Sequence, residues 1–455
     1  MQAVLSFCVL CLLLVAGKAV RTAVPFLRKL FLPSSLIAGA IGLVLLTFWG
    51  DGCLSSCHKG WSSLPGFLIN IVFATLFIGQ KFPKMGKIKN TVAEQLCFGQ
   101  IVAWGMYVVG IGVTMLLLVP LFDVPPVFGN LIEIGFSGGH GTVGGMQAVF
   151  EEMKWEAGSA LGYTTATVGM IVGVTVGMAL INHAVRKGEV KYIRSDEDLS
   201  KAEQRGFYPI RKRPAAGMQT VMCDSIDSLA WHLAVVGLAV LAGYALKEGL
   251  LLVNRILPAS VSSLKIVESI PLFPLCMIGG LLIQSFLNAT KLAPLVDRGQ
   301  IDRIGGASLD FLVVSAVATI QLKFLVDNWM PLTVLLLFGV AWSFFSATVL
   351  AKAMFKEDRF ERMICEFGQF TGVTATGLLL LRTVDPESKT SAPTAFGCKQ
   401  LFHEPVMGGG VWTAMAVPLV VKLGPWHVFF ISLAMMVLWW ALWYVFLRKD
   451  AAKTK

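Results

Sequence analysis

Long apolar runs constrain this chain more than any other feature, because they recur along its whole length. Of its 455 residues, 55% are hydrophobic and only 15% are charged. A run of about 18 apolar residues can cross a bilayer as a helix. Lipid offers the backbone no hydrogen-bonding partners, so a lipid-exposed span must be helical or part of a closed barrel. The runs predict an all-α polytopic membrane protein, with helices near 2–19, 34–49, 64–80, 94–119, 159–184, 226–247, 269–290, 306–325, 332–352, 405–422 and 426–447.

The basic residues of the loops predict the orientation of these helices. The formal net charge is +10, and Lys and Arg gather in alternate loops, at 18–29, 81–89, 186–213, 291–303, 352–362 and 448–455. Cytoplasmic loops of membrane proteins carry such an excess. We therefore expect the N-terminus outside, and the central linker and the C-terminus in the cytoplasm. Topology accounts for the positive charge, so we expect no nucleic-acid partner. No basic region precedes the first run, which argues against a cleaved signal peptide.

Two polar, glycine-rich stretches interrupt this apolar pattern, at 137–145 and 368–377. They are typical of loops, and loops survive at membrane depth only where they line a cavity. The flanks of the first stretch lack a basic excess, which places them outside. Basic residues flank the second stretch on both sides, namely Lys356, Arg359, Arg362, Arg382, Lys389 and Lys399. We therefore predict two re-entrant hairpins that enter from opposite sides, at about 127–150 and 363–382.

The two hairpins divide the chain into halves of opposite orientation. We predict an N-terminal repeat of five helices at 1–184 and a cytoplasmic linker at 185–222. An inverted repeat follows at 223–425, and an extra C-terminal helix with a basic tail occupies 426–455. Transporters built from inverted repeats with broken helices bind substrate and coupling ions near the midplane, where the repeats meet.

The tips of the two hairpins supply the candidate substrate-binding residues. Their amides, at the start of a short helix, suit a carboxylate. His140 could contact the solute, relay a proton or bond to backbone in the turn. Arg382 could pair with a carboxylate or mark the cytoplasmic end of the hairpin. Alternatively, the glycines only permit close packing. The predicted set is Ser137, Gly138, Gly139, His140, Gly141, Thr142, Thr371, Gly372, Thr374, Thr376 and Arg382.

A second set of residues is predicted to hold the coupling ion. Hydroxyl and carbonyl oxygens suit a hard cation such as Na⁺. Thr75 and Thr319 lie on the third helix of each half, and Asp310 is an ionisable group in an apolar span, unless it is solvated near a helix end. The Na⁺ candidates are Thr75, Gly144, Asp310, Thr319, Gly368 and Thr374.

Several motifs are missing from the sequence. It contains no phosphate-binding loop, no zinc signature and no convincing Ser/His/Asp set, so we expect a transporter rather than an enzyme. An ion gradient is then the remaining energy source, and no cofactor is expected beyond Na⁺ as the coupling ion. Cys53 and Cys57 lie close together in a loop and could form a disulfide.

The segment Ser137-Gly138-Gly139-His140-Gly141-Thr142 resembles the signature of the bacterial sodium/glutamate symporter family. The stretch Pro33–Gly39, and Phe73-Ala74-Thr75 with Gly79, are similar to its second and third helices. The resemblance implies Na⁺-coupled uptake of glutamate or a related acid by a homodimer in the bacterial cytoplasmic (inner) membrane. It also implies an elevator motion of a transport domain against a scaffold. The chain departs from that pattern at 368–377, which has no histidine beside its first glycine, and in its extra C-terminal helix.

Other functions stay open on the sequence alone. A proton-coupled carrier of another organic anion would use Asp310 or His140 as its proton site. An ion channel could form its pore from the same opposed re-entrant loops. A membrane enzyme is disfavoured, because no catalytic set can be assembled.

Overall fold

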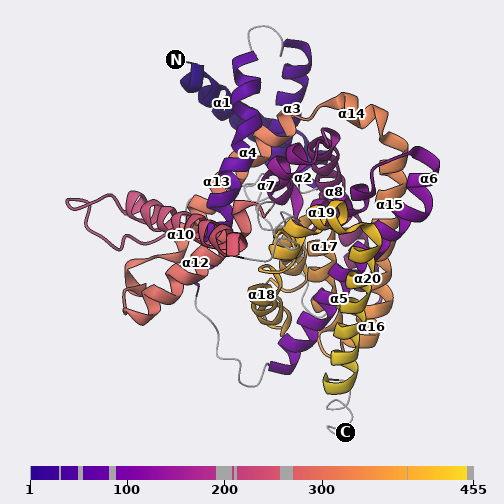
Figure 1. The fold of residues 1–455 in the computed structure, drawn as a ribbon. Coiled ribbons are helices and arrows are strands. Elements are labelled where there is room, and N and C mark those ends of the chain that lie inside the picture. The colour runs from indigo at the N-terminus through magenta and orange to yellow at the C-terminus, as the bar shows by residue number, and fades with distance from the viewer. Residues whose placement is uncertain are drawn as a thin grey trace. The chain divides into compact units, whose positions relative to one another are not determined.

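The computed structural model describes residues 2–29, 32–49, 55–80, 89–190, 207–209, 213–256, 270–386 and 388–447. Within these ranges every regular element is helical and none is a strand (Figure 1). The first group of α-helices is α1 (Gln2–Ala23), α2 (Pro25–Lys29), α3 (Ser34–Trp49), α4 (Ser55–Thr75), α5 (Lys89–Val113), α6 (Val119–Phe122), α7 (Gly139–Glu152) and α8 (Ala157–Arg186). The second group is α10 (Ser228–Ile256), α12 (Leu272–Ala289), α13 (Arg298–Ala318), α14 (Leu322–Asp327), α15 (Trp329–Phe345), α16 (Ala351–Met354), α17 (Arg359–Val384), α18 (Ala392–His403), α19 (Val411–Leu423) and α20 (Pro425–Leu442).

Short π and 3-10 turns extend or join these helices. The π turns are η1 (Thr114–Leu118), η3 (Glu133–Ser137), η7 (Ser346–Leu350) and η8 (Trp443–Leu447), and the 3-10 turns are η2 (Pro126–Asn130) and η6 (Ala293–Leu295). In the described part of the chain, eight helical stretches have the length and hydropathy of a membrane span when α17 is counted as one continuous stretch. The predicted all-α polytopic fold is confirmed at this level. Residues 191–206 and 210–212 of the predicted linker 185–222 lie outside the described residues, as does Cys53 of the predicted disulfide pair with Cys57.

The chain forms two compact units, each of which draws on both halves of the sequence. Unit 1 comprises 1–81, 140–154 and 199–321, and unit 2 comprises 82–139, 155–198 and 322–455. Unit 1 therefore holds α1 to α4, α7, α10, α12 and α13. Unit 2 holds α5, α8 and α14 to α20. The first three long helices of each half lie in unit 1, and the later ones lie in unit 2.

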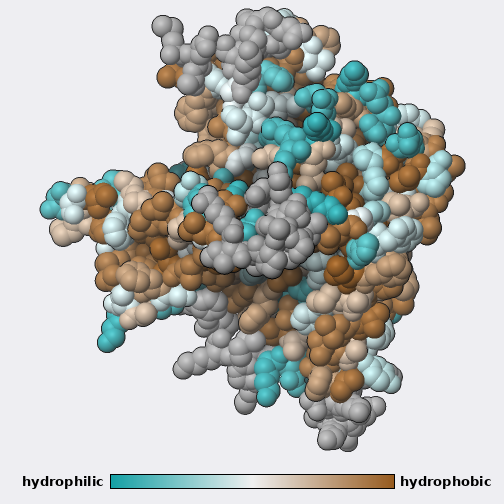
Figure 2. All heavy atoms as spheres, in the orientation of Figure 1, coloured by the Kyte–Doolittle hydropathy of each residue, from teal (hydrophilic) through white to brown (hydrophobic). Residues whose placement is uncertain are grey.

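Unit 1 is built around α4, which packs on α12 and α13. One buried core joins α4, α10, α12 and α13, with Ala74, Ala239 and Cys276 fully buried. A second core joins α1, α3, α4 and α13 around Trp61 and Leu10. The outer faces of α10 and α12 are covered by hydrophobic side chains (Figure 2). Such faces suit contact with lipid.

Unit 2 is built around α5, which packs against α15, α18 and α20. The helix α17 lies against α8 and α18 in the same unit. It is the most thoroughly buried of the eight candidate spans, with 72% of its most apolar window buried. Most polar residues in the first arm of α17, from Glu361 to Thr371, are therefore held inside the protein, where they need partners.

The helix α17 reverses direction in its middle. Gly372 and Val373 have non-helical backbone angles. A Cβ atom on Gly368 would lie 2.7 Å from the Cα of Gly377, and one on Gly377 would lie 2.4 Å from the carbonyl oxygen of Cys365. In a straight helix these residues would be about 13 Å or more apart. The segment is therefore a helical hairpin, and each arm is about 20 Å long or less, shorter than the roughly 30 Å hydrocarbon core.

Two sequence predictions of local structure are wrong. The stretch 137–145 is not a loop, because α7 begins at Gly139 and runs through most of it. The break is confined to the junction of η3 and α7, where Gly139 has φ of +70°. Likewise 368–377 is helical except at Gly372 and Val373. Glycine and threonine favour loops by local propensity, but packing in a buried interior holds them in helices here.

Candidate functional site

The backbone breaks of the two glycine-rich stretches meet in unit 2. Gly139 has φ of +70° and Val373 has φ of +64°. A Cβ atom on Gly139 would lie only 2.4 Å from Cγ1 of Val373. Positive φ at a β-branched residue costs on the order of 1–3 kcal/mol and persists only where the surroundings impose it. Such outliers cluster at ligand sites and switch regions. This junction is therefore the centre of the candidate site.

Two glycines of α8 let the tip of the α17 hairpin pack closely against that helix. A Cβ atom on Gly169 would lie 2.3 Å from the carbonyl oxygen of Thr371, and one on Gly173 would lie 2.6 Å from its Oγ1. The Thr371 hydroxyl donates to the Phe367 carbonyl at 2.7 Å, inside its own helical arm. Small residues at such positions allow close approach of membrane helices. Thr371 thus fixes the tip against α8 through its backbone and side chain.

A buried carboxylate, Glu133, lies one helical turn before this junction. Its side chain is fully buried. It accepts hydrogen bonds from the Tyr107 hydroxyl at 2.7 Å, the Gly408 amide at 2.8 Å and the Thr413 hydroxyl at 3.1 Å. Three donors on one carboxylate hold the chain between α18 and α19 against η3.

The hydroxyl of Ser137 faces the same chain segment. A Cβ atom on Gly408 would lie 3.4 Å from Ser137 Oγ. That oxygen is buried and has no hydrogen-bond partner among the described residues. A buried polar atom without a partner is costly, so Ser137 Oγ is available to accept a bond from a ligand or a water or to coordinate an ion.

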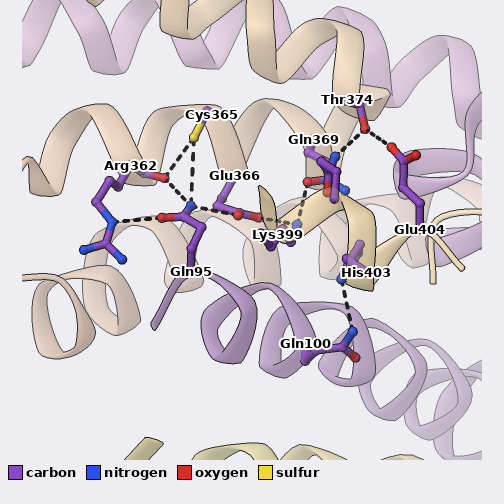
Figure 3. Close-up of polar contacts among 11 residues, drawn as sticks. Gln95, Gln100, Arg362, Cys365, Glu366, Gln369, Thr374, Lys399, His403 and Glu404 are labelled. Carbon is purple, nitrogen blue, oxygen red and sulfur yellow. Dashed lines mark hydrogen bonds and ion pairs between the residues drawn. The ribbon is translucent and has the colours of Figure 1, made fainter. Parts of the chain in front are cut away.

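Thr374, the first residue after the break, joins the tip to α18. Its hydroxyl donates to Oε1 of Glu404 at 2.9 Å (Figure 3) and accepts from Nε2 of Gln400 at 2.6 Å. The remaining amide oxygen of Gln400 has no partner within the described chain and is buried. The tip therefore presents a carboxylate, a hydroxyl and a free amide oxygen together.

A buried cluster of charged and amide side chains continues from this tip along α17. We call it the charged cluster, and it consists of Glu94, Gln95, Arg362, Glu366, Gln369 and Lys399. Figure 3 shows its members other than Glu94. Arg362 and Lys399 are 1% and 0% exposed. The sequence prediction that they are cytoplasmic loop charges is therefore wrong, because both are paired inside the protein. Lys356, Arg382 and Lys389 remain exposed.

The predicted substrate-binding residues fall into two groups. Unit 2 contains Ser137, Gly138, Gly139, Thr371, Gly372, Thr374, Thr376 and Arg382, whereas unit 1 contains His140, Gly141 and Thr142. Within unit 2 the tip residues come together, and Thr376 Oγ1 lies 2.8 Å from where a Cβ on Gly372 would be. Arg382 is exposed, and it lies about 13 Å from the tip along the second arm.

The predicted Na⁺ ligands are similarly divided. Gly368 and Thr374 belong to unit 2, and Thr75, Gly144, Asp310 and Thr319 belong to unit 1. The hydroxyls of Thr75 and Thr319 donate to helix carbonyls, those of Val72 and Ser315. The Thr75 carbonyl accepts from Arg298 at 2.8 Å. These hydroxyls are engaged in their own helices.

The sequence prediction did not include Glu133, Glu366, Gln400 or Glu404. Glu133 stands inside an apolar run, Leu131-Ile132-Glu133-Ile134, and an ionisable residue in such a run is a signal in itself. Gln400 and Glu404 lie beyond any apolar run of membrane length. Only the packing of α18 against α17 brings them to the tip.

The family model described as sodium/glutamate symporter matches residues 1–384. No curated protein and no solved structure matches the chain.

Proposed function

Because the chain belongs to the sodium/glutamate symporter family, we propose that it carries glutamate or a related small carboxylate together with Na⁺. It is a multi-pass membrane protein. The observation that carries the proposal is the meeting of the two backbone breaks, at Gly139 and Val373, inside unit 2. Two broken elements from different halves of the chain are the arrangement that transporters use around a solute.

The broken helix α17 offers ligands for both a cation and an anion. Its first arm ends at Thr371, and the last carbonyls of a helix lack intrahelical partners and attract cations. Its second arm begins at Thr374, and the first amides of a helix favour a carboxylate. Opposite ends of two helix dipoles thus meet at Gly372 and Val373. The solute carboxylate would bind the amides, and Na⁺ would bind the carbonyls.

The unsatisfied oxygens beside the tip complete the proposed site. Ser137 Oγ and Gln400 Oε1 are buried and have no partner among the described residues, and both oxygens suit Na⁺ or a solute ammonium group. The Glu404 carboxylate, bonded to Thr374, would also attract an ammonium group. Glu133 does not contact the solute in this proposal. It positions the site indirectly, because it holds Gly408 beside Ser137.

The division into units suggests how the site moves. The first three long helices of each half share unit 1, and the hairpin α17 lies in unit 2. This matched division supports inverted repeats at 1–184 and 223–425. We propose that unit 2 is the transport domain and unit 1 the scaffold of an elevator-type homodimer in the bacterial inner membrane. In this proposal α17 is a re-entrant hairpin, since its arms are too short to cross.

Uptake into proteoliposomes tests the proposal. An inward Na⁺ gradient should accelerate uptake of glutamate or a related acid, whereas an equal K⁺ gradient should not. Thr374→Val removes the hydroxyl that bonds to both Gln400 and Glu404. It should weaken apparent solute affinity by about tenfold or more, since two such hydrogen bonds contribute about 1–3 kcal/mol together. Thr383→Val is the matched control, because that hydroxyl bonds only to Leu379 in its own helix.

Two results would contradict this proposal and favour another function. Uptake that follows a pH gradient and persists without Na⁺ would assign proton coupling instead. If the solute concentration inside the vesicles never rises above that outside, the protein would be a channel.

A further inference from the structure

Unit 2 contains an ion pair that is completely removed from solvent. The ammonium of Lys399, on α18, lies 3.0 Å from Oε2 of Glu366, on the first arm of α17, and both side chains are 0% exposed. The same ammonium donates to Oε1 of Gln369 at 2.7 Å (Figure 3). None of these three residues takes part in the proposed solute site.

The space for the lysine is built into the neighbouring helix. A Cβ atom on Gly99, in α5, would lie 2.3 Å from Cε and 2.9 Å from Nζ of Lys399. The ammonium also lies 5.0 Å from the ring centre of Phe370 and 5.5 Å from that of Phe396. Aromatic faces at these distances attract a cation. The surroundings of the ammonium therefore leave room for, and attract, one positive charge.

The other cation of the charged cluster is already compensated. Arg362 pairs with Glu94 at 2.9 Å, and its Nε donates to Oε1 of Gln95 at 2.9 Å. The amide of Gln95 then donates to Oε1 of Glu366 at 2.8 Å. Arg362 thus reaches Glu366 only through an amide, which leaves Lys399 as the direct counter-ion of Glu366.

The remaining charged and titratable groups around the pair come from α17 and from α18 with the turn after it. Cys365 and Arg362 face Glu366 from the same arm. Glu404 and His403 lie within electrostatic range of the lysine ammonium. The His403 ring contacts Gln100, with 3.3 Å between Nδ1 and Nε2. The lysine is accordingly the only positive group that touches Glu366 directly within the described chain.

The ligands around Lys399 would suit a free cation equally well. The carboxylate of Glu366 and the amide oxygen of Gln369 are hard oxygen donors of the kind that monovalent cations prefer. A buried carboxylate stays ionised only with a cation or several hydrogen-bond donors beside it. Apart from the lysine, the described contacts of Glu366 include one amide donor, from Gln95, so without Lys399 the carboxylate would bind an ion or a proton. We propose that the Lys399 ammonium is a tethered counter-cation, which permanently fills a cation site formed by Glu366 and Gln369. This site then adds no dissolved ion or proton to the transport cycle, a consequence that rests on the proposed symport.

Thermal unfolding of the full chain in detergent, without solute, tests the pair directly. Lys399→Met leaves Glu366 without a cation, so the folded variant should bind a proton that the unfolded chain releases. Its folding equilibrium constant should then fall by up to about tenfold per pH unit as pH rises. NaCl should stabilise it more than choline chloride does, beyond any effect on the wild type. Lys352→Met removes an exposed lysine of the same unit and should behave as the wild type.

Two further variants keep the test decisive if Lys399→Met does not fold. Glu366→Gln leaves the ammonium uncompensated and should show the opposite trend, with stability rising as pH rises. The double variant Glu366→Gln/Lys399→Met should recover the wild-type pH and salt profiles. Failure of the double variant to recover them, or a Lys399→Met profile equal to that of the wild type, would overturn the proposal.

Uptake measurements separate this inference from the proposed function. If the wild type takes up no solute with Na⁺, the symport proposal fails, but the unfolding profiles still decide whether Lys399 fills a cation site. If the wild type does transport, uptake by Lys399→Met should gain activation by acid or by added Na⁺, and the double variant should lose it. A folded, active Lys399→Met variant with the wild-type ion dependence would refute the role in coupling.

Discussion

The two arms of the α17 hairpin come very close together at Gly377. We therefore predict that Gly377→Ala lowers both the stability of the protein and its affinity for solute. A Cβ atom there would lie 2.4 Å from the Cys365 carbonyl oxygen, 3.1 Å from Cζ of Phe396 and 3.3 Å from the Cys365 carbonyl carbon, where ordinary contacts begin at 3.4 Å. The main obstacle is backbone, which no rotamer change can move aside. The arms must therefore separate by about 1 Å.

The expected loss of stability follows from this separation. Overpacking a tight interior costs about 1–3 kcal/mol, and a backbone obstacle favours the upper end of that range. Alanine is better than glycine in a helix by about 1 kcal/mol. Gly377→Ala should therefore destabilise the protein by about 2 kcal/mol. Gly397→Ala, in α18, meets nothing within 4 Å and should be neutral or stabilising by up to about 1 kcal/mol.

The same separation should weaken solute binding. Thr374 is hydrogen-bonded to Gln400 at 2.6 Å and to Glu404 at 2.9 Å, and a shift of about 1 Å takes both contacts to or beyond the limit of a hydrogen bond. Two such bonds contribute about 1–3 kcal/mol together, so apparent affinity should fall by about tenfold or more. Thermal unfolding and initial uptake rates in proteoliposomes measure the two effects. If Gly377→Ala matches Gly397→Ala in both assays, the hairpin geometry argued for α17 is refuted.

Three further predictions concern the tip and its surroundings. Gly139→Ala should abolish uptake because its Cβ would lie 2.4 Å from Val373, and Gly139→Ala/Val373→Ala should recover part of it; no recovery would disprove the contact. Glu133→Gln puts an amide N–H₂ or a weaker acceptor opposite the Gly408 amide and should lower the free energy of unfolding by about 1–3 kcal/mol, whereas an unchanged melting temperature would contradict its structural role. Arg382→Gln should change apparent solute affinity less than twofold, since that side chain is exposed far from the tip; a tenfold loss in uptake assays would restore it as a ligand.

Most of the long helices could be located from the sequence, although predicted and observed ends differ by up to nine residues, as for 64–80 against α4 and 226–247 against α10. The predicted helix at 34–49 coincides with α3, and that at 159–184 lies within α8, Ala157–Arg186. Hydropathy is a local property, and lipid imposes the helical state on any long apolar run. The short helix α18 was missed, because its twelve residues include Lys399, Gln400 and His403. Its polar residues are buried only by contact with α5 and α17.

The candidate site was predictable only in part, because local sequence patterns show where the backbone breaks but not which distant residues surround the breaks. Glycine-rich composition located both backbone breaks, at Gly139 and at Gly372 with Val373, because glycine is where a membrane helix most readily leaves helical geometry. The ligands around the breaks come from distant segments. Glu133 bonds to Gly408 and Thr413 across more than 270 residues of chain. No local pattern specifies such a pairing.

The sequence by itself determined that this chain is a helical membrane protein with two breaks, since hydropathy and glycine content act over a few turns of chain. The tertiary structure decided what each charge does. As basic residues flanking a polar stretch, Arg362 and Lys399 predict cytoplasmic loops, yet they are buried beside Glu94 and Glu366. The physical reason is that a charge is tolerated in a low-dielectric interior only when a counter-charge is brought beside it. Folding alone brings α5, α17 and α18 together to provide it.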